Sequence, residues 1–143
     1  ATPRISLSAF SARSTPRMTS MIPRITEPSA VHALPALRRL AGSGRVWERV
    51  AAAEALWRID GDPAPVLPVF RAAWSENPYT RGAIAGCLAG MGPAGAPLRD
   101  LVTAELAGPR RHTARPGGYG SHDIAQDERL LADCRRALAR QAR

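Results

Sequence analysis

Lysine is absent from this chain of 143 residues, and 20 arginines supply its formal positive charge. Alanine, glycine and proline are abundant at the same time. This composition is typical of a GC-rich coding sequence and favours a bacterial source. The arginine bias is therefore not by itself evidence that forked, bidentate hydrogen bonds were selected.

Cysteine is scarce, because only Cys87 and Cys134 occur. They form no CxxC motif and no histidine stands beside either, so neither a zinc motif nor a disulfide framework is indicated. No apolar run approaches the roughly 18 residues that a membrane span requires. We therefore expect a cytoplasmic protein in a reducing environment, without a membrane span, a cofactor or an indicated small-molecule ligand.

Acidic side chains are fewer than basic ones, and the formal net charge is +8 with a pI near 11.3. Such a charge favours nucleic acid, acidic protein or anionic lipid as a partner. The 12 acidic residues are mixed among the arginines, so a solvated, arginine-biased surface explains the charge equally well. Both interpretations stay open at this point.

Hydrophobic periodicity is missing from residues 1–28, which are rich in proline, serine and arginine. Glu27 is the only acidic residue in this segment. Such a composition predicts an extended N-terminal arm rather than a packed element. The remaining residues, 29–143, have the length of one domain.

The periodic part of the chain contains an internal repeat. Trp47–Ile59 (WERVAAAEALWRI) matches Tyr79–Met91 (YTRGAIAGCLAGM) at an offset of 32 residues. The segments before them, Leu34–Arg38 (LPALR) and Leu67–Arg71 (LPVFR), match at an offset of 33. A third copy aligns only after an insertion. Self-similarity at such a period predicts a solenoid, in which each helical pair buries its apolar face against its neighbours.

These segments resemble HEAT repeats, in particular the short bacterial HEAT-like variety of the phycobilisome-lyase type. The resemblance implies an all-α fold, an α-solenoid of about three helical pairs. The pairs would span 29–60, 64–91 and 94–141, with an inserted loop at 108–124. HEAT-like repeats serve many unrelated roles, so the resemblance indicates a fold and not a function.

Apolar spacing and turn residues predict the individual helices. In the first helix, a leucine recurs every three residues after Val31, and this spacing predicts one buried face. The expected helices are Ser29–Ala41, Arg45–Ile59, Ala64–Ser75, Pro78–Met91, Ala94–Ala107 and Ala125–Gln141.

Glycine recurs every four residues in the helix expected at Pro78–Met91, as Gly82, Gly86 and Gly90. Each glycine costs about 1 kcal/mol of helix stability relative to alanine. We therefore expect a compensating contact, in which this face packs very closely against another helix.

Aromatic and arginine residues open the two matching helices. Trp47 with Arg49, and Tyr79 with Arg81, occupy equivalent places. The second helices line the concave face of HEAT-like stacks, so these residues could form a ladder for a peptide or a phosphate backbone. Alternatively, the aromatic rings pack between repeats and the arginines stack over them. We favour packing for the aromatic residues, and both interpretations stay open for the arginines.

The loop 108–124 is the other candidate site, since insertions in solenoids often lie on the binding face. Its basic and aromatic side chains could contact phosphate and stack on a base. We favour the alternative, a surface loop without a binding role. Its two histidines are too far apart, on a glycine-rich segment, to predict a metal site. The candidate residues are Arg110, Arg111, His112, Arg115, Tyr119 and His122.

No recognisable arrangement of nucleophile, base and metal ligands is present, so we predict that the chain is not an enzyme. HEAT-like repeats also occur in DNA glycosylases, but here only Trp57 and Asp60 lie in suggestive proximity, and Trp57 is expected in the core. We predict a non-catalytic scaffold for protein–protein interaction. The alternative is a nucleic-acid-binding module that uses an arginine-rich concave face and the 108–124 loop.

Overall fold

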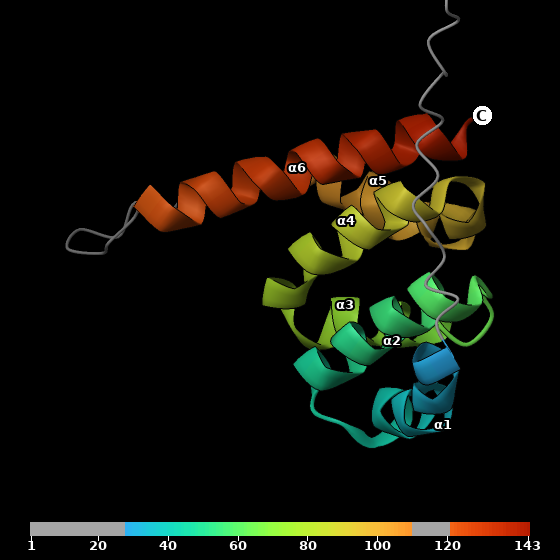
Figure 1. Cartoon of the computed structure of the whole chain (residues 1–143). Coiled ribbons are helices and arrows are strands. Elements are labelled where there is room, and N and C mark those ends of the chain that lie inside the picture. The colour runs from blue at the N-terminus through green and yellow to red at the C-terminus, as the bar shows by residue number, and fades with distance from the viewer. Residues whose placement is uncertain (1–27, 110–120) are drawn as a thin grey trace, which may run out of the picture.

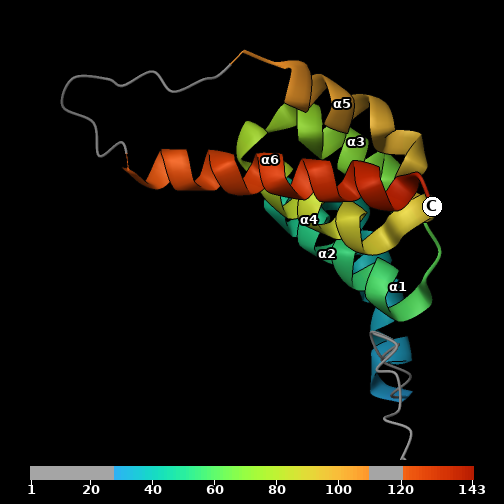
Figure 2. The ribbon, with the colours of Figure 1, turned by 90° about the horizontal axis from the view of Figure 1, so that it is seen from above.

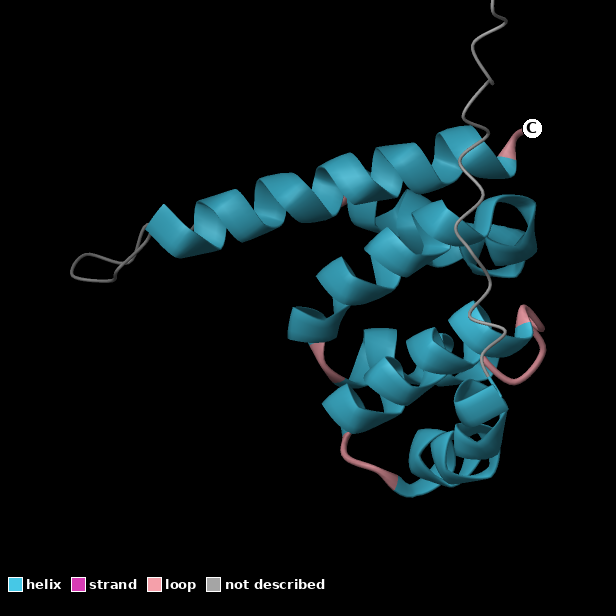
Figure 3. Ribbon diagram, in the orientation of Figure 1, coloured by secondary structure: helices cyan, strands magenta, loops and turns pink. Residues whose placement is uncertain are grey.

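The described residues form an all-helical fold (Figure 1). The computed structural model describes residues 28–109 and 121–143, and no strand occurs in these two ranges (Figure 3). This confirms the all-α expectation for the same ranges. Most of the expected arm, residues 1–27, and the centre of the inserted loop, residues 110–120, lie outside the described residues.

Each expected helix occurs, and all but one begin and end within about one turn of the expected positions. Two short 3₁₀ helices, η1 and η2, lead into α4 and α5. In chain order the elements are α1 (Pro28–Ser43), α2 (Val46–Asp60), α3 (Leu67–Glu76), η1 (Pro78–Thr80), α4 (Arg81–Met91), η2 (Gly92–Leu98), α5 (Arg99–Ala107) and α6 (Ser121–Gln141).

The exception is α5, which begins at Arg99 rather than at Ala94. The 3₁₀ helix η2 occupies the residues before it. Pro93 and Pro97 have no backbone N–H to donate, so regular α-helical bonding is interrupted across this segment. Gly92 begins η2 with a φ of 57°, a conformation that favours glycine.

The end of α2 follows its sequence signals. Gly61 adopts the left-handed conformation with a φ of 69°, and its N–H donates to the carbonyl of Trp57 at 2.9 Å. The Asp62 side chain then accepts the N–H of Ala64 at 2.9 Å. Glycine at this position and proline at position 63 therefore stop the helix as expected.

Neighbouring helices pack largely in chain order. α1 packs against α2, and α2 packs against α3. α6 lies against both α4 and α5, and its contact with α4 is the more extensive. Figures 1 and 2 show that α2, α4 and α6 begin on the same side of the molecule, and that α6 extends beyond α4 on that side. We call these three elements the second helices.

One apolar cluster runs through the described helices. Both residues are buried at two pairs of positions that the internal repeat aligns, namely Ala52 and Ile84, and Leu56 and Leu88. Trp57 is partly buried and packs against this core, as expected. The large side chains that are fully buried include Leu56, Val66, Phe70, Ile84, Leu88, Leu98 and Val102.

The apolar residues of α1 do not share one face. Val31 is 54% exposed and Leu40 is 39% exposed, whereas Leu34 and Leu37 pack against the core. An interval of three residues falls short of one 3.6-residue turn, so the spacing drifts around the helix. Over nine residues this drift brings Val31 and Leu40 to opposite sides. The expectation of one buried face was therefore wrong at its two ends.

The glycines of α4 are not in close contact with another helix. A Cβ atom built at Gly82 or Gly90 would meet nothing within 4 Å. At Gly86 it would meet only Asp133 Oδ2, at 3.6 Å, which is ordinary van der Waals contact. The expectation of very close packing was therefore wrong, because these glycines face open space on the exposed side of α4.

Candidate interaction surface

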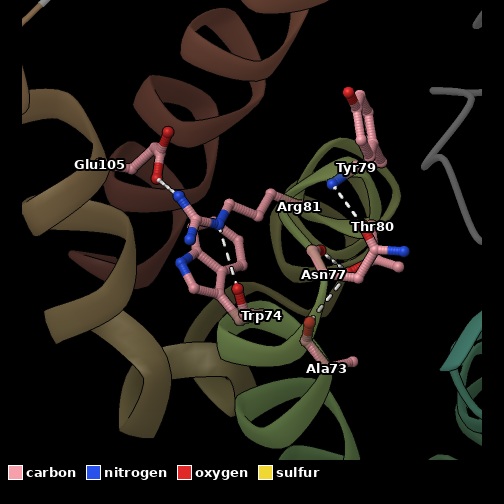
Figure 4. Close-up of polar contacts among 7 residues, drawn as sticks. All are labelled: Ala73, Trp74, Asn77, Tyr79, Thr80, Arg81 and Glu105. Carbon is pink, nitrogen blue, oxygen red and sulfur yellow. Dashed lines mark hydrogen bonds and ion pairs between the residues drawn. The ribbon is translucent and has the colours of Figure 1, made fainter.

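The two aromatic residues that open the matching helices are exposed. Trp47 is 50% exposed in the first turn of α2, and Tyr79 is 77% exposed in η1. In Figure 4 the Tyr79 ring is directed away from the other labelled side chains. The expectation that both rings pack between repeats was wrong, because the core-facing positions of these turns belong to smaller residues such as Val50 and Thr80.

The arginine beside Tyr79 turns inward. Arg81 Nη1 donates to Glu105 Oε2 at 2.9 Å, and Arg81 Nε donates to the carbonyl of Trp74 at 3.1 Å (Figure 4). Its guanidinium lies 5.7 Å from the centroid of the Trp74 ring, a cation–π contact. The Arg81 and Glu105 side chains are only 17% and 5% exposed. This arginine therefore stacks on a core tryptophan of α3 and not on Tyr79.

The equivalent arginine of α2 makes an equivalent ion pair. Arg49 Nη2 pairs with Glu76 Oε2 at the end of α3, and the two side chains are 20% and 52% exposed. Arg81 in α4 reaches Glu105 in α5 in the same way. Each arginine thus joins a second helix to the α-helix that follows it in the chain, α2 to α3 and α4 to α5. Sequence reasoning missed both acids: Glu105 lies in the last turn of the helix expected at Ala94–Ala107, and Glu76 directly follows the helix expected at Ala64–Ser75.

A short hydrogen-bond network holds Tyr79 at its exposed position. Asn77 Oδ1 accepts the backbone N–H of Tyr79 at 3.0 Å. The buried Thr80 hydroxyl lies 2.7 Å from the Asn77 carbonyl and 3.1 Å from the Ala73 carbonyl, and both oxygens accept from it. Because the Asn77 N–H and the Thr80 hydroxyl both donate to the Ala73 carbonyl of α3, the ring between them in the chain is presented from a fixed turn.

Other arginines of the described surface are also paired with acids. Arg71 forms two hydrogen bonds to Asp100, each 2.9 Å long, and a third to the carbonyl of Pro97. These bonds lower the pKa of Asp100 and raise the pKa of Arg71. The further pairs are Arg38 with Asp60, Arg58 with Glu54 and Arg136 with Asp133.

The loop candidates are not placed by the structure. Arg110, Arg111, His112, Arg115 and Tyr119 lie outside the described residues. His122 belongs to the first turn of α6. Among the side chains that the structure describes, no group of histidine, cysteine or acidic residues could hold a metal ion.

The two cysteines are free thiols in apolar surroundings. Cys134 is buried in α6, and Cys87 in α4 is partly buried. Desolvation raises the pKa of each thiol to about 12, and the charges of Glu54 near Cys87 and Glu105 near Cys134 act in the same direction. Both thiols are therefore protonated at neutral pH and poorly nucleophilic.

No family model matches this chain, and no curated protein or solved structure is significantly similar to it. Within the described part of the chain, no helix is long and apolar enough to cross a membrane.

Proposed function

We propose that this chain is a non-catalytic scaffold that binds another protein through the exposed side of its second helices. The observation that carries this proposal is the pair of exposed aromatic side chains, Trp47 and Tyr79, at matching positions of α2 and η1. Large aromatic residues are frequent anchors in protein interfaces.

We further propose that the helices form a solenoid of HEAT-like pairs. The repeated ion pairs support this arrangement, because Arg49–Glu76 and Arg81–Glu105 connect successive pairs in the same way. The position of α4, which contacts α6 extensively and α2 to a small extent, supports it as well. In such a stack the second helices offer one continuous surface to a partner.

The alternative, binding of nucleic acid by an arginine-rich face, is less well supported by the described residues. Arg49 and Arg81, which the sequence offered for phosphate contacts, already form ion pairs within the chain. Breaking the Arg81–Glu105 pair would leave a buried carboxylate without this partner, which is costly. Phosphate contacts through these two arginines are therefore disfavoured.

Affinity purification from lysate tests the proposed function, with the full chain as bait and with nuclease added to half of each sample. The proposal predicts that a defined protein is retained by the wild-type chain and survives nuclease treatment. The double variant Trp47→Ala/Tyr79→Ala should lose that protein, because both anchors are removed.

Val31→Ala supplies the matched control, since Val31 is 54% exposed but lies on α1. This variant should retain the same protein as the wild type. Recovery that disappears with nuclease would instead establish nucleic acid as the partner. Retention by the Trp47→Ala/Tyr79→Ala variant would contradict the proposed surface.

A further inference from the structure

The described helices meet at two junctions that differ in their contacts. α1 and α2 (residues 28–60) lie at one end of the molecule, and α6 lies at the other (Figure 1). We call α1 and α2 the N-terminal pair. The first junction separates this pair from α3 and α4, and the second separates α3 and α4 from α5 and α6. α6 contacts α4 extensively, whereas α2 meets the later helices mainly through α3 and contacts α4 only to a small extent.

Two arginines that the repeat aligns, Arg38 in α1 and Arg71 in α3, make different contacts. Arg71 crosses the second junction, because it donates two hydrogen bonds to Asp100 of α5 and one to the Pro97 carbonyl, each 2.9 Å long. Arg38 donates to Asp60 at the end of α2, at 3.2 Å. That bond stays within the N-terminal pair, so among the described side chains no equivalent link crosses the first junction.

The aligned residues Arg49 and Arg81 differ in how completely they are bonded. Arg81 donates through Nη1 to Glu105 and through Nε to the Trp74 carbonyl, and its guanidinium stacks on the Trp74 ring. Arg49 pairs through Nη2 with Glu76, but its Nε atom is buried without a hydrogen-bond partner. A buried donor that lacks an acceptor is unfavourable. The link that Arg49 makes is therefore the weaker one.

The sequence explains this difference. At the repeat offset of 33 residues, Trp74 of α3 aligns with Ala41 of α1, and an alanine offers no ring on which Arg49 could stack. Arg49–Glu76 is the one ion pair that the described side chains place across the first junction. The Glu76 side chain is 52% exposed, and an ion pair so open to water contributes little.

We propose that the N-terminal pair opens from the remaining helices as one unit, about a hinge at residues 61–66. The unit stays intact because α1 packs extensively against α2 and Arg38 bonds Asp60. Residues 61–66 connect α2 to α3, and Asp62, Ala64 and Pro65 in this segment are exposed. Hinges are commonly a few residues at the ends of elements. The first junction thus opens locally while the second stays closed.

The opening moves the two exposed aromatic residues relative to each other, because Trp47 lies on α2 and Tyr79 in η1. The turn that carries Tyr79 is bonded to α3 through Asn77 and Thr80. The inference concerns the free chain, but its consequence for binding rests on the proposed function. A partner that contacts both rings at one separation holds the first junction in one state.

Hydrogen exchange of the full chain, measured by mass spectrometry at a series of low urea concentrations, tests the inference. Protection factors in α1 and α2 should be alike and at least about tenfold lower than those in α4 and α6. Their dependence on urea should be shallower than that of global unfolding, because opening of the N-terminal pair exposes only part of the buried surface.

Two outcomes of this measurement would overturn the inference. Equal protection of α2 and α4 would mean that the N-terminal pair opens only when the whole chain unfolds. Exchange that is fast in α1 alone, with α2 as protected as α4, would be fraying of an end helix rather than opening of the pair.

A matched pair of variants separates the two junctions. Arg71→Met removes bonds that stay intact when only the N-terminal pair opens. It should lower protection about threefold in α4 and α6 and leave α1 and α2 unchanged. Arg49→Met removes a bond that breaks in both kinds of opening, so protection should fall by a similar factor in all these helices. An equal fall in all helices with Arg71→Met, or unchanged protection of α2 with Arg49→Met, would overturn the inference.

Addition of the affinity-purified protein tests the consequence for binding. Protection of α1 and α2 should rise at least about tenfold with the wild type, at saturating partner, and stay unchanged with Trp47→Ala/Tyr79→Ala. Partner binding without this rise would overturn the coupling between opening and binding. If no protein is retained but the free chain exchanges as expected, the proposed function fails and the inference stands.

Discussion

At the residue scale, the matched aromatics are exposed, against the packing role that the sequence favoured for them, whereas the matched arginines, whose role the sequence left open, form ion pairs within the chain. Arg81 is almost buried against Trp74 and Glu105, whereas Tyr79, two positions earlier, is exposed. The aromatic ring that an arginine covers is the tryptophan of α3. Composition and spacing could not reveal which residue is exposed and which is buried, because they do not specify which way each side chain of a first turn points.

The first prediction concerns the inward arginine. Arg81→Met should lower the free energy of unfolding by about 3 kcal/mol, because it removes an ion pair whose side chains are largely buried. Arg49→Met, at the more exposed equivalent pair, should cost less than about 1 kcal/mol. Urea denaturation of both variants with unchanged m-values measures the difference. Similar costs at the two sites would contradict the structural distinction between them.

The second prediction compares two glycines that are close in sequence. Gly90→Ala should stabilise the protein by about 1 kcal/mol, because Gly90 is helical and its Cβ would meet open space. Gly92→Ala should destabilise it, because the φ of 57° at Gly92 is unfavourable for a residue with a Cβ. Thermal unfolding of the two variants provides the comparison. A loss of stability in Gly90→Ala would indicate a close contact at Gly90, against the open space that the structure shows there.

At the element scale, much of the fold was predictable. Helix positions followed from apolar periodicity and from turn residues such as Gly61, since these signals are local. The delayed start of α5 was missed because Pro93 and Pro97 favour η2 over a continuous helix. The exposure of Val31 and Leu40, the first and last of the apolar residues spaced by three in α1, was missed because a three-residue interval drifts around a helix.

The third prediction concerns the thiols of Cys87 in α4 and Cys134 in α6. Because the pKa of Cys87 and of Cys134 rises from 9.0 to about 12, the thiolate appears at higher pH in the folded chain. Alkylation by iodoacetamide in the native protein should therefore remain slow at pH values where an unfolded cysteine is half ionised. In urea the reaction should follow the ordinary thiol pKa. Fast native alkylation near pH 9 would contradict the raised pKa of both thiols.

At the scale of the whole molecule, long-range contacts determine which residues remain available to a partner. Glu76 and Glu105 engage the two arginines that the sequence offered as a ladder. These acids lie more than twenty residues from their partners, so no local pattern identified the pairing. Trp47 and Tyr79 remain uncovered, and the sequence had already named both as binding candidates. The internal repeat therefore predicted where the candidate surface lies, although not which of its side chains are free.

Site-specific photo-crosslinking tests most directly whether the exposed side of the second helices binds another protein. A benzophenone amino acid would replace Tyr79 in one variant and Val31, which is exposed on α1, in another. The account predicts a nuclease-resistant crosslink to one protein from position 79 and none from position 31. Absence of a protein crosslink from position 79, or equal crosslinking from both positions, would contradict it.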